Sequence, residues 1–92
     1  MELKDTVKLM NSEDYKERFK AEFLQTKIRY EKLKKYNTKI ESADMTRFER
    51  NAVEPPKFDC PMHLLRDQQR VMGEYLHILE VRAEIEGINL ED

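Results

Sequence analysis

The chain of 92 residues has no tryptophan, one cysteine, two glycines and three prolines. A single cysteine excludes an internal disulfide and a cysteine-based zinc site. The scarcity of glycine and proline, with 39% charged residues, is typical of a protein built from long helices rather than a β-sandwich or barrel. Regular apolar spacing argues against disorder despite the high charge.

Long apolar runs and enzyme signatures are also missing. No run approaches the roughly 20 residues that a membrane span needs, and no signal-peptide pattern opens the chain. There is no Gly-rich phosphate loop, no HExxH and no Gly-x-Ser-x-Gly. The net charge of −2 argues against general binding to nucleic acid or to acidic membrane. We therefore expect a cytoplasmic protein that is not an enzyme and has no cofactor.

Residues 60–87 show the clearest helical pattern. Asp59 can cap the start of a helix, Pro61 fits its first turn, and Gly87 can supply the left-handed residue after its end. The apolar face recurs at threes and fours and comprises Leu65, Met72, Leu76, Leu79 and Ala83. A polar row follows its edge at intervals of seven and comprises Gln68, Tyr75 and Arg82. This pattern predicts one long helix that packs against another.

A second long helix is predicted from Glu13 to about Ile40, where glycine and proline are absent. Its apolar face is largely aromatic and comprises Tyr15, Phe19, Phe23, Thr26, Tyr30, Leu33 and Ile40. About 27 residues at 1.5 Å each give a length of roughly 40 Å. Before it, residues 1–12 are expected to form a short helix, with Asn11 and Ser12 offering the cap of the long one.

Residues 42–58 form the connector between the two long helices. Asp44 can cap a short helix over Met45–Asn51, and Pro55-Pro56 then imposes extended backbone. Seventeen residues are many for a link between antiparallel helices, so part of the connector is expected to be folded or functional.

These elements predict an all-α fold of two long antiparallel helices with a short N-terminal helix. We divide the chain into an N-terminal segment, residues 1–12, and a hairpin domain, residues 13–92. Two helices bury only one seam, which is little core for a stable monomer. Some apolar residues lie off the two stripes and should stay exposed in a monomer: Leu24, Ile28, Val71, Ile78 and Val81. The sequence therefore favours self-association into a helical oligomer.

Charge is unevenly distributed along the chain. Residues 15–40 hold nine basic and three acidic side chains, whereas residues 41–92 hold six basic and twelve acidic ones. The simpler interpretation is that complementary helices pair edge to edge. The other, compatible with it, is that the first helix offers a basic surface to an anion.

Aromatic and charged side chains on the predicted faces suit a nucleotide, because arginine binds phosphates bidentately and aromatic rings stack on bases. The candidate ligand-binding residues are Tyr15, Arg18, Phe19, Glu22 and Arg29 on the first helix and Gln68, Tyr75 and Arg82 on the second. The two arginines of the first helix would hold phosphates, and its first two aromatic rings would stack on a base or ribose. Gln68 and Tyr75 would read polar edges.

The same residues have a structural interpretation. An aromatic stripe at helical spacing is more often core, and an arginine beside it more often pairs with a carboxylate of the partner helix. Such pairs would be Arg82 with Glu22, or Arg29 with Glu74. The two histidines of the second helix are fourteen residues apart, about 21 Å, too far to share a metal within one chain. No metal site is expected.

The run LLRDQQRVMGEYLHILEVR resembles the second helix of a phage family of short helical hairpins. The matching positions are Leu64, Leu65, Gln68, Met72, Tyr75, Leu79 and Arg82. The run AEFLQTKIRYEKLKKY is similar to the first helix of that family, through Lys32, Leu33 and Tyr36. The resemblance covers residues 13–41 and 59–88 and leaves out the connector.

This resemblance implies a hairpin shared with phage anti-CBASS and anti-Thoeris sponges. These proteins are oligomers, often hexamers, that sequester cyclic oligonucleotides or ADP-ribose signals of TIR enzymes without cleaving them. The chain lacks the β-rich portion of the anti-Thoeris sponges and the Tyr-Arg-Asp-Leu-Thr run of the anti-CBASS sponges, so both ligand classes stay open. The resemblance implies an oligomeric sponge in the cytoplasm of an infected bacterium. The alternative is a structural or adaptor hairpin that binds another protein through its exposed apolar strip.

Overall fold

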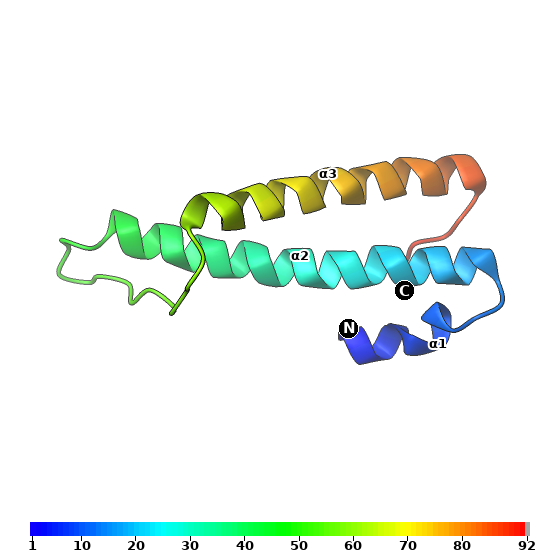
Figure 1. Cartoon of the computed structure of the whole chain (residues 1–92), viewed down its shortest axis with the longest axis horizontal. Coiled ribbons are helices and arrows are strands. Elements are labelled where there is room, and N and C mark those ends of the chain that lie inside the picture. The colour runs from blue at the N-terminus through cyan, green and yellow to red at the C-terminus, as the bar shows by residue number, and fades with distance from the viewer. Residues whose placement is uncertain (92) are drawn as a thin grey trace.

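The computed structural model describes residues 1–91, which contain helices and no strand. A 3-10 turn, η1 (Leu3–Thr6), leads into α1 (Val7–Met10). The long helices α2 (Tyr15–Met45) and α3 (Met62–Glu86) lie antiparallel along most of a molecule that measures 53 × 25 × 21 Å (Figure 1). The predicted fold class, an all-α hairpin with a short N-terminal helix, is confirmed.

α2 begins later than its predicted cap. Asp14 has extended backbone, and its Oδ1 accepts a hydrogen bond from the Lys16 amide at 2.9 Å. The hydroxyl of Ser12 accepts from the Asp14 amide at 3.0 Å, so it supports the cap rather than forming it. A carboxylate at this position also faces the positive end of the helix dipole, which favours Asp14.

α2 also ends later than predicted, because it continues through the start of the expected connector to Met45. The predicted short helix over Met45–Asn51 is wrong, and Asp44 lies inside α2 instead of capping a new helix. No glycine or proline interrupts the backbone here. Three hydroxyls along this end, those of Thr38, Ser42 and Thr46, donate to the carbonyl four residues earlier at 2.7, 2.8 and 2.8 Å.

The connector after α2 has no regular helix but folds back on α2. The Tyr36 hydroxyl donates to the carbonyl of Lys57. Ile40 and Ala43 of α2 are buried, and they line one hollow together with Val53 and Phe58 of the connector. The connector therefore covers the end of α2 that extends beyond α3.

α3 starts at Met62, two residues after the predicted start. Pro61 occupies the cap position with extended backbone, and no side chain caps the helix, so the predicted Asp59 cap is wrong. The predicted end is confirmed. Gly87 has a left-handed φ of 69°, and its amide and that of Ile88 both donate to the Ala83 carbonyl. This 6→1 bond turns the tail back toward α2.

The buried core lies between the first half of α2, the second half of α3 and the tail. Its members are Phe19, Phe23, Leu24, Leu76, Leu79, Ala83 and Ile88. Leu24 was expected to be exposed, which is wrong, because Leu9 of α1 and Leu90 of the tail pack against this cluster. The exposure predicted for Val71, Ile78 and Val81 is confirmed, whereas Ile28, also expected to be exposed, is half-buried.

The N-terminal segment packs along α2 on the side away from α3 (Figure 1). Thr6 is its fully buried anchor. The Thr6 hydroxyl donates to the Leu3 carbonyl at 2.7 Å and accepts from the Gln25 amide nitrogen at 2.8 Å. Both capacities of the hydroxyl are used, so burying it leaves no unpaired polar atom.

Candidate functional site

Arg82 lies at the centre of a polar cluster between the start of α2 and the end of α3. Its Nη2 donates to Tyr15 Oη at 2.8 Å, and its Nε donates to Glu86 Oε2 at 3.1 Å. The Tyr15 hydroxyl donates to Glu86 Oε1 at 2.9 Å. The guanidinium carbon lies 4.9 Å from the centroid of the Phe19 ring. We call these four residues the Arg82 cluster, in which a planar cation is oriented by a ring, a phenol and a carboxylate.

A second polar contact joins the same two helices nearer their middle. The Tyr75 hydroxyl donates to Glu22 Oε1 at 3.3 Å, and the Thr26 hydroxyl donates to the same oxygen at 3.2 Å. Tyr75 precedes Arg82 by two turns of α3, so the two contacts lie on one side of the hairpin. They form a strip of phenols, carboxylates and one guanidinium.

The structure brings together five of the eight candidate residues: Tyr15, Phe19, Glu22, Tyr75 and Arg82. Arg18 lies in the first turn of α2, and its Nη1 donates back to the Ser12 carbonyl in the bend before the helix at 2.9 Å. Arg29 and Gln68 are exposed and contact none of the five through a hydrogen bond within residues 1–91. The assignment of all eight to a ligand site stays a prediction.

The ion pairs predicted across the helices are wrong. Arg82 pairs with Glu86 rather than Glu22, and Glu74 pairs with Arg70, at 3.1 Å, rather than with Arg29. A carboxylate four residues along the same helix is reached without crossing the seam between helices. Glu86, which orients both Arg82 and Tyr15, was missed by the sequence analysis, although its spacing of four from Arg82 signals the pair.

The environment of both phenols favours their neutral form. The hydrogen bond to the Glu86 carboxylate, with burial, raises the pKa of Tyr15, because ionisation would place two negative charges together; Arg82 opposes this rise. Burial raises the pKa of Tyr75, and the charge of Glu22 and the hydrogen bond to it raise it further. Both residues therefore remain hydrogen-bond donors at neutral pH.

We expect these two phenols to make folding stability fall at alkaline pH. Unfolded tyrosine loses its proton near pH 10, whereas the folded state keeps it longer. The contribution is thus complete below pH 10 and is lost as pH rises through the raised folded pKa values. Urea unfolding at pH 8 and pH 11 should show a larger loss for the wild type than for the double variant Tyr15→Phe/Tyr75→Phe. Equal losses would contradict this assignment.

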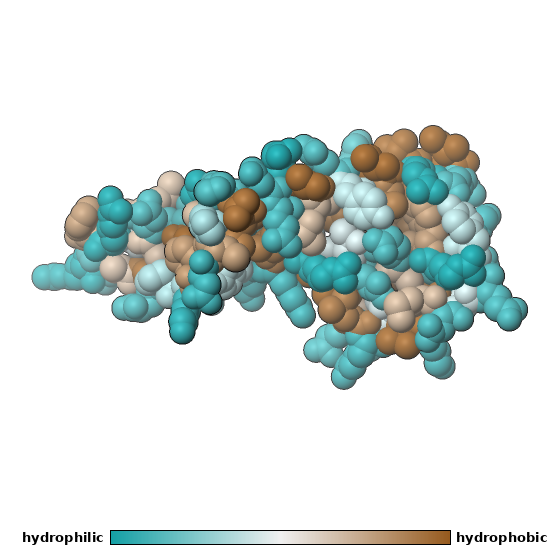
Figure 2. Space-filling model, viewed as in Figure 1, coloured by the Kyte–Doolittle hydropathy of each residue, from teal (hydrophilic) through white to brown (hydrophobic). Residues whose placement is uncertain are grey.

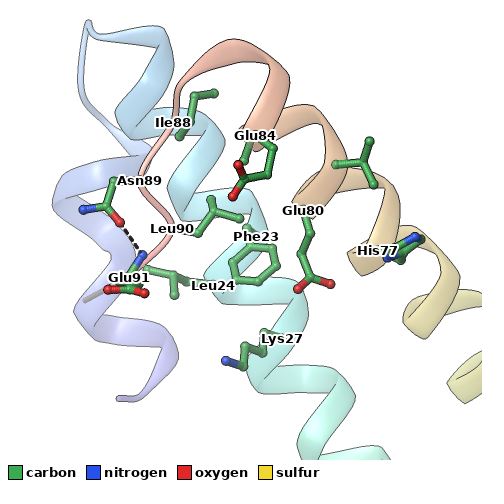
Figure 3. Close-up of a pocket in the computed structure, with 12 residues that line it drawn as sticks. Phe23, Leu24, Lys27, His77, Glu80, Glu84, Ile88, Asn89, Leu90 and Glu91 are labelled. Atoms are coloured by element: carbon green, nitrogen blue, oxygen red, sulfur yellow. Dashed lines mark hydrogen bonds between the residues drawn. The ribbon is translucent and has the colours of Figure 1, made fainter.

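One large hollow of the surface is unsuited to an anion. It has a volume of about 780 Å³ and lies between α2, α3 and the tail (Figure 3). Glu80 and Glu84 of α3 and Glu91 of the tail line it, against a single lysine, Lys27. Three carboxylates and one ammonium repel a phosphate. The Arg82 cluster is therefore the better candidate for an anionic ligand.

Two other features are absent from residues 1–91. No three histidine, cysteine, aspartate or glutamate side chains gather as metal ligands in this part of the chain. None of its helices is both long enough and apolar enough to cross a membrane.

Comparison with known proteins gives one match. The family model of Sequestin matches residues 13–85, which include α2, the connector and all but the last residue of α3. No curated protein and no solved structure matches the chain. Since the family model spans most of its length, the chain belongs to the Sequestin family.

Proposed function

We propose that this protein is a non-enzymatic sponge that binds and sequesters a nucleotide immune signal, either a cyclic oligonucleotide or an ADP-ribose derivative made by TIR enzymes. The observation that carries the proposal is the Arg82 guanidinium held over Phe19. An arginine has five N–H donors, and the hydrogen bonds to Tyr15 and Glu86 use two of them. Three donors remain for a phosphate, on a cation that is already oriented.

Base recognition would use the exposed parts of this strip. Phe19 is buried beneath Arg82, so its ring supports the guanidinium instead of stacking on a base. Tyr15 and Tyr75 are 46% and 39% exposed, so each offers part of a ring and a hydroxyl to a ligand. A base can also stack on the outer face of the guanidinium. This revises the stacking role expected of Phe19.

Sequestration without turnover is supported by the chemistry of the strip. A phenol with a raised pKa is a poor nucleophile at neutral pH, and the carboxylates of Glu86 and Glu22 that accept from Tyr15 and Tyr75 are too weak as bases to remove a phenol's proton. Arg82 and Tyr75 belong to the motif that resembles the phage sponges, and the name of the Sequestin family itself denotes sequestration. Together these support a role in blocking host defence by a phage.

The proposal includes self-association through α3. Four apolar side chains follow one another at intervals of seven on its outer face, with exposed fractions of 52, 51, 55 and 79%: Leu64, Val71, Ile78 and Ile85. Hydrophobic residues gather on the α3 side of the surface, most visibly near the end of that helix (Figure 2). A repeat of seven is the spacing at which two helices bury one shared seam.

The charge distribution of α3 favours a second copy of this chain as the partner that covers its exposed apolar face. Residues 62–73 of α3 hold two basic and one acidic side chain, whereas residues 74–86 hold one basic and four acidic ones. Two antiparallel α3 helices would place unlike halves opposite each other. Gln68, Tyr75 and Arg82 each follow a seam residue by four positions, so the second copy would cover one edge of the strip.

Ile78→Glu is expected to reduce the oligomer to a monomer at micromolar concentration, because it places a charge at the centre of the apolar seam. Light scattering coupled to gel filtration measures the mass. His63→Glu is the matched control, since His63 is exposed on the same helix but lies about 100° around it from Leu64. A wild-type mass of one chain, or an unchanged mass of Ile78→Glu, would refute the seam.

The function itself is tested by thermal unfolding with a panel of cyclic dinucleotides and cyclic ADP-ribose isomers. A ligand at 100 times its dissociation constant should stabilise the protein by about 2.7 kcal/mol, which raises the melting temperature by several degrees. A single-stranded DNA oligonucleotide serves as the control and should give no shift. The exposed apolar residues on the outer face of α3 are also compatible with an adaptor hairpin that binds another protein through them. A lack of response to every panel member would favour this alternative.

A further inference from the structure

The opposite end of the hairpin holds a buried polar atom without a partner. Asn37 of α2 is 4% exposed, and its Nδ2 donates to the Leu65 carbonyl at 3.1 Å and to Gln69 Oε1 at 2.9 Å. Because the Leu65 carbonyl only accepts, the amide cannot be flipped. Asn37 Oδ1 is buried and accepts no hydrogen bond within residues 1–91. Such an orphaned acceptor is uncommon in folded proteins and calls for a donor.

Asn37 lines a hollow of about 350 Å³ between the middle of α2 and the first half of α3. We call this hollow the Asn37 groove and define it by Tyr30, Lys34, Asn37, Arg66, Gln69 and Gly73. Asn37 Oδ1 is closed to solvent in this structure, so a hydrogen-bond donor that enters the groove reaches it only when a neighbouring side chain moves aside. The groove therefore holds an unsatisfied acceptor among its lining residues, which a purely cationic patch does not.

Unengaged positive charge flanks this acceptor. Lys34 of α2 and Arg66 of α3 both line the groove, and neither forms an ion pair within residues 1–91. Arg70 also lines it, but Glu74 engages its guanidinium at 3.1 Å. Glu41 is the one carboxylate among the lining residues. The balance is positive, so an anionic group is favoured beside the donor that Asn37 requires.

Gly73 keeps the wall of the groove open. A Cβ at this position would lie 3.3 Å from Cε1 and 3.5 Å from Oη of Tyr30. The Tyr30 ring thus lies against bare backbone, with its hydroxyl at the groove. Glycine in a helix interior is less favourable than alanine by about 1 kcal/mol. The close approach of the Tyr30 ring explains why glycine nevertheless occupies position 73.

We propose that the Asn37 groove is a separate binding site for a small phosphate ester that carries a hydroxyl donor. Lys34 and Arg66 bind the phosphate, and Asn37 Oδ1 accepts a hydrogen bond from the hydroxyl. Asn37 follows Phe19 by 18 residues of α2, which corresponds to about 27 Å. A ligand held by Arg82 would have to span that length of α2 to contact Asn37. The groove therefore takes a ligand of its own, although Gly73 in its wall is two residues from Tyr75 of the strip.

The probe is ribose 5-phosphate, followed by ¹H–¹⁵N NMR on the full chain. We expect shifts of the Gly73 backbone amide and the Asn37 side-chain amide. Ribose should give none, and inorganic phosphate should bind about tenfold more weakly, because each lacks one of the two recognised groups. Lys34→Gln and Arg66→Gln should each weaken binding about tenfold through loss of a charged hydrogen bond. Lys35→Gln, next to Lys34 but outside the groove, should leave binding unchanged.

Three results would overturn the proposal. Absence of shifts at Gly73 and Asn37 at millimolar ribose 5-phosphate would remove the site. Equal affinity for inorganic phosphate would show that Asn37 recognises no hydroxyl. Equal weakening by Lys35→Gln and Lys34→Gln would show general attraction to a basic helix. Responses at Tyr15 and Glu86 report on the Arg82 cluster, so failure of either site is seen separately.

Discussion

Replacing Arg82 with glutamine is expected to weaken binding of the tightest ligand in the nucleotide panel by about tenfold or more. The variant removes the charge and the forked donors while keeping a polar amide at about the position of the arginine Nε. Hydrogen bonds to a charged group contribute about 1.5–3 kcal/mol, which corresponds to this change in dissociation constant. Calorimetry measures it, and circular dichroism checks that the helices remain.

Arg47→Gln is the matched control for this variant. Arg47 also pairs with a carboxylate, Asp44 at 3.1 Å, and lies over an aromatic ring, that of Phe48 at 5.0 Å. It lies in the connector just past the far end of α2, so its loss should leave affinity unchanged. Equal affinity of Arg82→Gln and wild type would exclude the Arg82 cluster as the phosphate site.

Two further variants rank the neighbouring groups. Tyr75→Phe should weaken binding less than Arg82→Gln, because it removes one neutral hydroxyl, and should cost about 1 kcal/mol of stability. Arg18→Ala tests the phosphate role that the sequence predicts for Arg18. A tenfold loss would place the ligand across the bend before α2, whereas no loss would restrict it to the Arg82 cluster.

Leu79→Ala is expected to lower the free energy of unfolding by about 2–5 kcal/mol. Leu79 is 2% exposed and lies in the single buried cluster between α2, α3 and the tail. A chain of this size has a total stability of roughly 5–14 kcal/mol, so one such cavity removes a large share. Urea unfolding followed by circular dichroism measures the loss.

Phe48→Ala is the control for this core variant. It truncates a larger apolar side chain, but Phe48 is 90% exposed and should change stability by less than about 0.5 kcal/mol. A loss at Leu79 no greater than that at Phe48 would mean that this cluster does not hold the hairpin together.

The sequence predicts the two long helices because their signals are local. Spacing of apolar residues at threes and fours identifies Phe19 and Phe23 on α2 and Leu76, Leu79 and Ala83 on α3, and all five are buried. Gly87 ends α3 in a left-handed conformation as predicted, since few residues other than glycine adopt it readily. Boundaries without such a signal were misplaced, as at Met45 and Met62.

The candidate site was predictable only in part. Periodicity selects faces of helices, so it identified Tyr15 and Phe19 on one helix and Tyr75 and Arg82 on the other. It assigned Arg82 to Glu22 across the seam, because it considered pairs between the two helices. The structure pairs Arg82 with Glu86, four residues along the same helix, at 3.1 Å.

The sequence by itself determined an all-α hairpin, its aromatic and apolar stripes and the exposure of Val71, Ile78 and Val81 on α3, because helix formation and amphipathicity depend on near neighbours. Only the tertiary structure decided the fate of residues that touch distant segments. Leu24 is buried by α1 and the tail, Arg18 turns to the Ser12 carbonyl, and Asn37 reaches Leu65 across the seam. These contacts depend on how far the helices overlap and how the tail returns, which no local spacing encodes.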